Sequence, residues 1–183
     1  LRLSRGLGDV YKRQGLKSER EQGITIDVAY RYFETTNKKF IIADSPGHVQ
    51  YTRNMVTAAS TADLSLILID ARKGVLSQTK RHLFISSFIN IEKIIVCINK
   101  MDLVDYSEKI FNKIVNQFKN ISEKLNFESI IFIPISALHG DNIVNKTKNM
   151  KWYSELSLLD ILNEIKTSPQ YSIDNPRFPV QYV

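Results

Sequence analysis

Three continuous apolar runs separated by helical patterns predict an α/β protein with a doubly wound, mostly parallel sheet. The runs occupy residues 64–69, 94–98 and 130–135, and their lack of polar alternation is typical of strands buried on both faces. Because strands joined by helices form right-handed crossovers, these three strands are expected to run parallel. In such sheets, ligands bind beyond the carboxyl ends of the strands.

An antiparallel strand pair is predicted ahead of these runs. Apolar or aromatic side chains alternate with other residues at Ile24, Ile26, Val28, Tyr30 and Tyr32. The dipeptide Asn37-Lys38 then gives a turn signal before a second strand at residues 40–43. The sheet is therefore expected to contain one antiparallel strand.

Four further segments show helical patterns, at residues 51–59, 78–88, 106–125 and 158–166. In the longest of them, Ile110, Ile114 and Phe118 fall on one apolar stripe, and Lys113 is left to face water. This amphipathic pattern predicts a helix that packs its stripe against the core.

The composition is that of a globular protein. Of the 183 residues, 43% are hydrophobic and 24% are charged, which excludes disordered and disulfide-scaffold classes. The longest nearly unbroken apolar stretch, residues 130–138, is far shorter than the roughly 20 residues of a membrane span, so no membrane partner is expected. The single cysteine, Cys97, rules out an internal disulfide and predicts a reducing, cytoplasmic setting.

The formal net charge of +6 is distributed unevenly. Residues 1–14 supply half of it, with four basic residues against Asp9. The remaining positive charges are scattered among acidic residues, which differs from the clustered basic stripe of nucleic-acid-binding proteins. No nucleic-acid partner is therefore expected.

The motif Asn99-Lys100-Met101-Asp102, at the end of the run 94–98, predicts a guanine-binding loop. Guanine presents N1–H and an exocyclic amino group side by side, and the Asp102 carboxylate can accept both hydrogen bonds. Adenine would leave that carboxylate unpaired, so such a site can discriminate by on the order of 10⁴-fold. Asn99 would brace the loop, and Lys100 would lie along the base. An ordinary polar turn is the alternative explanation of these four residues taken alone.

Ser136, Ala137 and Leu138 follow the last apolar run, one strand–helix unit further along the chain. A backbone N–H of Ser136-Ala137 would point at guanine O6. Because both loops follow neighbouring parallel strands, they are expected to bind the same base.

Asp44 and Gly47, in the sequence Asp-Ser-Pro-Gly-His, predict a site that senses the γ-phosphate. Asp44 would hold Mg²⁺ through water, and the Gly47 N–H could approach a phosphate oxygen because no side chain intervenes. Thr25 could offer its hydroxyl to the same Mg²⁺, although a simple strand threonine is the alternative.

The chain has three histidines, and the motifs assign chemistry to one of them. His48 directly follows Gly47, so it is expected to orient the attacking water and to be the catalytic residue. His82 and His139 have no motif beside them and are expected to be exposed loop histidines.

A phosphate-binding loop is missing from this set of motifs. The pattern Gly-x-x-x-x-Gly-Lys-Ser/Thr occurs nowhere in the 183 residues. Either the chain is truncated at its N-terminus, or it is a natural relative that keeps the fold without the chemistry. The abrupt change of composition after Gln14 favours truncation, with residues 1–14 as a non-native leader similar to translated adapter sequence.

Taken together, the motifs resemble the translation-factor class of P-loop GTPases. This resemblance rests on residues 19–27, 44–48, 99–102 and 136–138. Further segments resemble the family of large, GTPase subunits of bacterial sulfate adenylyltransferase, at residues 27–33, 50–55, 70–75, 103–107, 140–142, 152–153 and 177–183.

The resemblance covers residues 15–183 and has implications for the domains. It implies a P-loop GTPase-like sheet without its first strand, its P-loop and its first helix. Residues 15–168 would form a partial GTP-binding domain. Residues 169–183 would form a linker and the first strand of a following β-barrel domain.

The resemblance also implies a function. The subunit would bind GTP and Mg²⁺ and couple GTP hydrolysis to adenylyl transfer from ATP to sulfate, which yields adenosine 5′-phosphosulfate. The adenylylation itself would belong to a catalytic partner subunit. Ser45 and Val49 stand where this family usually has threonine and glutamate, which puts the dynamics of the switch after Asp44 in question.

Two other functions stay open at this point. An elongation-factor-type translational GTPase would share the nucleotide motifs, and aminoacyl-tRNA binding would identify it. A nucleotide-free interaction module would account for the missing phosphate loop. Residues 51–55 and 177–183 favour the sulfate-activating GTPase over both.

Overall fold

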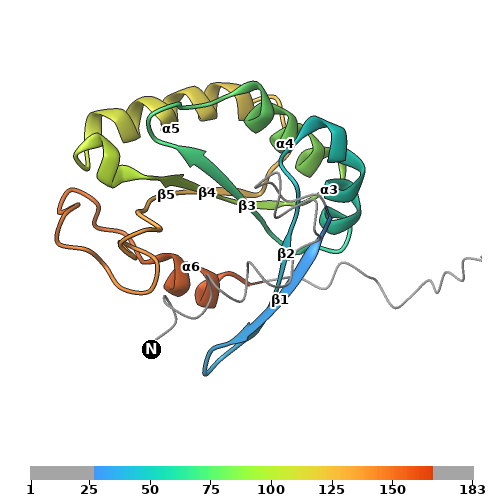
Figure 1. Cartoon of the computed structure of the whole chain (residues 1–183), viewed down its shortest axis with the longest axis horizontal. Helices are drawn as coiled ribbons and strands as arrows, with labels where there is room; N and C mark the ends of the chain where they lie inside the picture. The colour runs from blue at the N-terminus through green and yellow to red at the C-terminus, as the bar shows by residue number, and fades with distance from the viewer. Residues whose placement is uncertain (1–26, 167–183) are drawn as a thin grey trace, which may run out of the picture.

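A computed structural model describes residues 27–166 and confirms the predicted α/β class. Thr25, the leader at residues 1–14 and the β-barrel strand expected within 169–183 lie outside the described residues. Figure 1 shows a central sheet with α4 (Ser77–Phe88) and α5 (Glu108–Ser122) on one side and α6 (Leu158–Glu164) on the other. No helix within residues 27–166 is long and apolar enough to cross a lipid bilayer.

The centre of the fold is a parallel sheet with the strand order β3-β4-β5. Its strands are β3 (Ser65–Asp70), β4 (Lys93–Asn99) and β5 (Ser129–Pro134). These strands are the three apolar runs of the sequence. The middle strand is buried throughout residues 94–98, as the absence of polar alternation predicts.

The predicted antiparallel pair is present as β1 (Ala29–Glu34) and β2 (Lys39–Asp44). The two rings of Phe33 and Phe40 stack across this hairpin at 4.6 Å between centroids. Within residues 27–166, the hairpin forms a sheet of its own, because β2 has no hydrogen-bonded ladder with β3. This is the difference from the continuous sheet that the sequence predicts.

The hairpin is held at its tip by the end of α6 (Leu158–Glu164). Thr35 N donates to Lys38 O at 2.8 Å and closes the turn, and Thr35 Oγ1 donates to Asn163 Oδ1 at 2.8 Å. Lys38 Nζ donates to Leu162 O at 3.2 Å and also to Ile165 O. The two bonds from Lys38 satisfy backbone carbonyls that a helix C-terminus leaves without intrahelical partners.

The other helices lie close to the predicted segments, as α3 (Thr52–Ala59), α4 (Ser77–Phe88) and α5 (Glu108–Ser122). A short 3-10 turn, η1 (Val49–Tyr51), precedes α3. The start of α5 is two residues later than predicted because Asp105 and Tyr106 have φ angles of 51° and 53°. Positive φ angles are incompatible with a right-handed helix.

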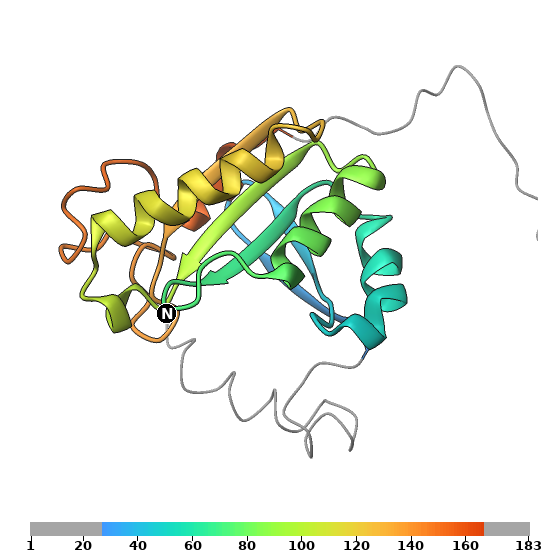
Figure 2. The same ribbon diagram turned by 90° about the horizontal axis from the view of Figure 1, so that it is seen from above.

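Helices cover both faces of the parallel sheet, as Figures 1 and 2 show from two directions, and an apolar cluster lies on each side of it. On the side of α4 and α5, Ile69, Leu83 and Phe118 belong to the larger buried cluster. On the side of α6, Cys97 and Ile161 belong to the smaller one. The sheet is therefore a rigid platform for the loops at its carboxyl edge.

Candidate functional site

The predicted guanine-binding loops lie at the carboxyl edge of the parallel sheet. The register places Asp70, the last residue of β3, beside Asn99, the last residue of β4. The chain leaves β5 at Pro134 and reaches Ser136 two residues later. The rule that ligands bind beyond the carboxyl ends of parallel strands thus identifies one edge for all three loops.

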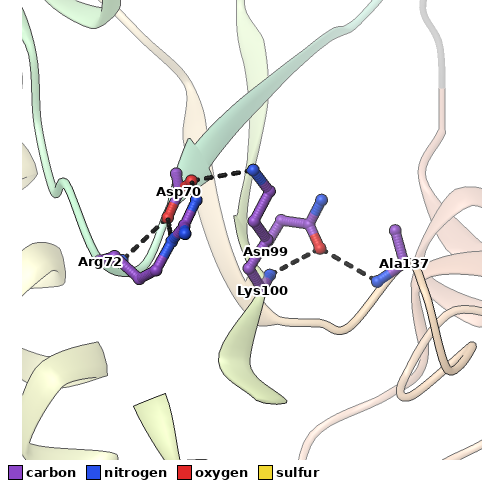
Figure 3. Close-up of polar contacts among 5 residues, drawn as sticks. All are labelled: Asp70, Arg72, Asn99, Lys100 and Ala137. Carbon is purple, nitrogen blue, oxygen red and sulfur yellow. Dashed lines mark hydrogen bonds and ion pairs between the residues drawn. The ribbon is translucent and has the colours of Figure 1, made fainter. Parts of the chain in front are cut away.

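Asn99 connects the loop after β4 to the loop after β5. Its Oδ1 accepts a hydrogen bond from Lys100 N at 2.7 Å and another from Ala137 N at 3.0 Å (Figure 3). Lys100 has a φ of 65°, in the left-handed region that residues other than glycine rarely adopt. The amide oxygen of Asn99 thus stabilises an unfavourable backbone conformation and links the two loops; that it braces a loop for a base stays a prediction.

Asp102 is held by Ser136. The Ser136 hydroxyl donates to Asp102 Oδ1 at 2.6 Å, and the Ser136 side chain is fully buried. Asp102 itself is half-buried in η2 (Met101–Val104), whose first residue, Met101, is fully buried. A buried donor on one carboxylate oxygen restricts the rotation of that carboxylate.

The backbone N–H groups of Ser136 and Ala137 have partners inside the chain. Ser136 N donates to Asp141 O at 3.3 Å, and Ala137 N donates to Asn99 Oδ1. The predicted contact with guanine O6 therefore requires one of these groups to exchange its acceptor. Leu138 is 82% exposed, so its side chain is accessible at the same edge.

Several polar residues support the loop after β5, and the sequence analysis assigned no role to them. Asn142, 2% exposed, donates through Nδ2 to Pro134 O at 3.0 Å and accepts from Thr147 N at 3.0 Å. The Tyr106 hydroxyl donates to Asp141 Oδ2 at 3.0 Å. The sequence signal was available in Gly140-Asp141-Asn142, a polar segment just after a predicted strand.

Asp70 is another residue to which the sequence reading gave no chemistry. Arg72 donates to its carboxylate through Nε at 3.0 Å and through Nη2 at 2.7 Å, and Lys100 Nζ donates at 2.9 Å (Figure 3). Hydrogen bonds from Arg72, and then from Lys100, hold the pKa of Asp70 well below its ordinary value, against the opposing effect of burial. The position of Asp70 in the sequence could have indicated a functional role, because Asp70 ends a buried strand as Asn99 does.

The segment after β2 contains the residues predicted to sense the γ-phosphate. Asp44 is the last residue of β2 and is half-buried, and Gly47 and His48 are exposed. The Gly47 carbonyl accepts from Gln78 Nε2 at 3.2 Å and from His82 Nε2 at 3.3 Å. These contacts join the segment to the first half of α4.

The prediction of an exposed loop histidine is wrong for His82. This residue lies on α4, is half-buried, and faces the Gly47 carbonyl. Burial lowers the pKa of His82, so the ring is neutral over more of the physiological range. His139 lies in a turn and is exposed, as predicted.

The described residues offer one of the two predicted Mg²⁺ ligands. Asp44 has a carboxylate, the type of ligand that Mg²⁺ prefers, and this ion often takes only one or two protein carboxylates beside substrate phosphates and water. Asp44 therefore fits the predicted role, while Thr25 lies outside the described range. Residues 27–166 contain no group of three or more His, Cys, Asp or Glu side chains suited to a metal.

Comparison with known proteins finds a matching family and several named relatives. The family described as "Elongation factor Tu GTP binding domain" matches residues 9–168. "Sulfate adenylyltransferase subunit 1" of Buchnera aphidicola subsp. Acyrthosiphon pisum (strain Tuc7) is 61% identical over 170 residues, which cover 92% of this chain and 36% of that protein. The protein of the same name from Sulfurovum sp. (strain NBC37-1) is 57% identical over 92% of this chain and 35% of its own length. The chain thus spans about a third of the curated relatives that it matches.

Solved structures with a similar fold include a translation elongation factor. Elongation factor SelB from Methanococcus maripaludis, in complex with the GTP analogue GppNHp, has a TM-score of 0.60 and 31% identity and covers 76% of this chain and 27% of its own. Sup35 complexed with GMPPNP has a TM-score of 0.61 and 28% identity, over 75% of this chain and 34% of its own.

Proposed function

This chain belongs to the family of elongation factor Tu GTP binding domains, and on that premise we propose that it recognises the guanine base of GTP through the loops after β4 and β5. The observation that carries the proposal is the hydrogen bond from the buried Ser136 hydroxyl to Asp102 Oδ1 at 2.6 Å. It orients the carboxylate that the guanine motif requires. The Asn99 bridge between the two loops fixes their spacing.

Asp102 is the residue that reads the base. Its carboxylate accepts from guanine N1–H and from the exocyclic amino group, and adenine has neither donor at these positions. Lys100 lies along the base, and Ala137 N or a neighbouring N–H of residues 136–138 donates to O6. Discrimination against adenine follows from the cost of leaving a carboxylate without partners.

Hydrolysis is assigned to the segment after β2. His48 orients the attacking water, and the Gly47 N–H binds a phosphate oxygen. Asp44, through water, and Thr25 would hold Mg²⁺, which neutralises charge on the phosphates when it is bound. The exposure of His48 is consistent with a side chain that acts on solvent water.

The longer protein is proposed to be the GTPase subunit of a sulfate adenylyltransferase, in the cytoplasm. The relatives of 54–61% identity that bear this name support the assignment. In that role, GTP hydrolysis is coupled to adenylyl transfer from ATP to sulfate, carried out by a catalytic partner subunit. The translation factors found among solved structures support a second candidate, a translational GTPase, at the lower identity of 31%.

A titration with mononucleotides tests guanine recognition in the chain itself. Guanosine 5′-monophosphate and adenosine 5′-monophosphate share their phosphate, so a difference between them reports on the base alone. Guanosine monophosphate is expected to shift the amide NMR signals of residues 99–102 and 136–138, and adenosine monophosphate is expected to leave them in place. Equal shifts with both nucleotides, or none with either, would contradict the proposal.

A second experiment separates the two candidate functions of the longer protein. The full-length polypeptide is mixed with the adenylyltransferase subunit, and GTP hydrolysis is followed with and without ATP and sulfate. Faster hydrolysis in the presence of both substrates supports the sulfate-activating role. Binding of aminoacyl-tRNA, with no response to ATP and sulfate, supports a translational GTPase instead.

A further inference from the structure

Asp70 lies at the base-binding edge but outside every motif that predicts nucleotide chemistry. It ends β3 directly beside Asn99, and its Oδ2 accepts a hydrogen bond from Lys100 Nζ at 2.9 Å (Figure 3). The Asp70 side chain is 15% exposed, whereas that of Lys100 is 47% exposed. A largely buried carboxylate thus holds the end of a largely accessible lysine.

Both ends of Lys100 are fixed by these contacts. Asn99 Oδ1 holds its backbone N–H, and Asp70 holds its ammonium group. The four methylenes between them must then run from the end of β4 to the end of β3. An aliphatic stem that is fixed in this way presents an apolar strip at the edge of the sheet.

We propose that Asp70 is a positioning residue for guanine recognition, which acts by holding Lys100 so that its stem forms one wall for the base. This inference rests on the proposed binding of guanine and goes beyond it, because Asp70 belongs to no guanine-reading motif. The carboxylate itself touches no nucleotide.

Arg72 keeps Asp70 in place. Its guanidinium binds the carboxylate through two side-chain hydrogen bonds, and its backbone N donates to Asp70 Oδ1 at 3.0 Å. Bidentate pairing of this kind fixes the plane of a carboxylate. Isolated surface ion pairs contribute little, but networks with bidentate geometry are the exception.

The charge of Asp70 matters as much as its shape. The carboxylate lies between two cations, Arg72 and Lys100, and shares Oδ2 between them. If Asp70 becomes asparagine, the side chain keeps its size but the two cations lose their common counter-charge. Lys100 is then expected to leave its position and to lose its alignment with the base.

The test compares Asp70→Asn with the wild-type chain in the titration with guanosine 5′-monophosphate. Asp70→Asn is expected to weaken binding on the order of five-fold, which corresponds to about 1 kcal/mol. Asp70→Glu keeps the charge and is expected to restore part of the affinity. Lys73→Gln removes one positive charge from the same turn and is expected to stay within about two-fold of wild type, because the Asp70–Lys100 contact remains.

A double-mutant cycle identifies the route of the effect. In the Lys100→Met background, Asp70→Asn is expected to cause no further loss, since the residue through which it acts is gone. An equal loss in both backgrounds, or an unchanged affinity of Asp70→Asn, would overturn the inference while guanine recognition stands. A wild-type chain that binds both mononucleotides equally would overturn the proposed function and this inference with it.

NMR spectroscopy of the Lys100 ammonium group tests the contact in the wild-type chain, so this test does not depend on the folding of a variant. In ¹⁵N-labelled wild-type chain, the ammonium group of Lys100 is expected to give a slowly exchanging NMR signal, because its protons are held by Asp70. The exposed Lys73 is expected to give none under the same conditions. Exchange of the Lys100 ammonium as fast as that of Lys73 would contradict the held geometry.

Discussion

Ser136 has a fully buried side chain whose hydroxyl donates to Asp102 at 2.6 Å. Alanine would fit the same space but would leave Asp102 Oδ1 without this donor. Ser136→Ala is therefore expected to lower the free energy of unfolding by about 1 kcal/mol and to weaken binding of guanosine monophosphate. Urea unfolding and the mononucleotide titration measure the two effects. Ser77→Ala, at an exposed position, is the control, and wild-type affinity in Ser136→Ala would contradict the orienting role.

The burial of Cys97 predicts a pH dependence of the stability of the fold that is independent of the candidate site. Its thiol is 2% exposed, and burial raises its pKa from the ordinary 9.0 to about 12. Because the native state keeps the proton longer than the unfolded state, this contribution to stability is complete below pH 9 and is lost as the pH rises toward 12.

Two measurements check this prediction. A thiol reagent at pH 8 is expected to modify the urea-unfolded chain but not the native chain, because the protonated buried thiol is unreactive. Unfolding midpoints measured between pH 8 and pH 11 are expected to fall more steeply in wild type than in Cys97→Ala. Rapid modification of the native thiol, or identical pH profiles, would contradict the burial of Cys97.

At the level of residues, the sequence predicted the positions of chemical groups better than their contacts. Asn99 and Asp102 could be placed at the end of a buried strand because apolar runs mark strands and motifs mark loops. A role for the Asp70 carboxylate was not predicted, because its partners, Arg72 and Lys100, come from two different loops. Only the register of β3 and β4 brings these loops together. His82 was misjudged because its contact with Gly47 joins residues that are 35 positions apart.

At the level of elements, the β1–β2 hairpin and α6 are coupled through Lys38. This side chain donates to two carbonyls at the C-terminus of α6, Leu162 O and Ile165 O. Lys38→Met keeps the aliphatic stem but removes these donors, so the last turn of α6 is expected to open more often.

Hydrogen exchange measures this opening. Amides of residues 161–165 are expected to exchange on the order of five-fold faster in Lys38→Met, as the loss of about 1 kcal/mol implies. Lys39→Met is a matched control, because the neighbouring Lys39 side chain is 87% exposed and forms only a 3.9 Å ion pair with Glu34. Equal protection in Lys38→Met and wild type would show that the hairpin does not stabilise α6.

Elements were predicted well where periodicity is strong and less well at their ends. The stripe that includes Ile114 and Phe118 located α5, because both residues pack into the larger core. Its start at Glu108 could not be read from periodicity, since the left-handed conformations of Asp105 and Tyr106 depend on loop contacts such as the bond from Trp152 Nε1 to the Tyr106 carbonyl.

At the level of the whole molecule, the parallel sheet places three strand ends at one edge, and guanine recognition is the function that we propose for them together. The last residue of β3 is Asp70, the loop after β4 supplies Asp102, and the loop after β5 supplies Ser136. The separation of the β1–β2 hairpin from this sheet was not predictable from local patterns, because pairing between strands depends on contacts distant in sequence.

The measurement that tests the central claim most directly is a change of base preference in Asp102→Asn. The amide of asparagine can donate to the second carbonyl of xanthine, which stands where guanine has its amino group, and it no longer matches both donors of guanine. Wild-type chain is expected to prefer guanosine monophosphate, and Asp102→Asn is expected to prefer xanthosine monophosphate. Unchanged binding of guanosine monophosphate by Asp102→Asn, with no gain for xanthosine monophosphate, would contradict the account.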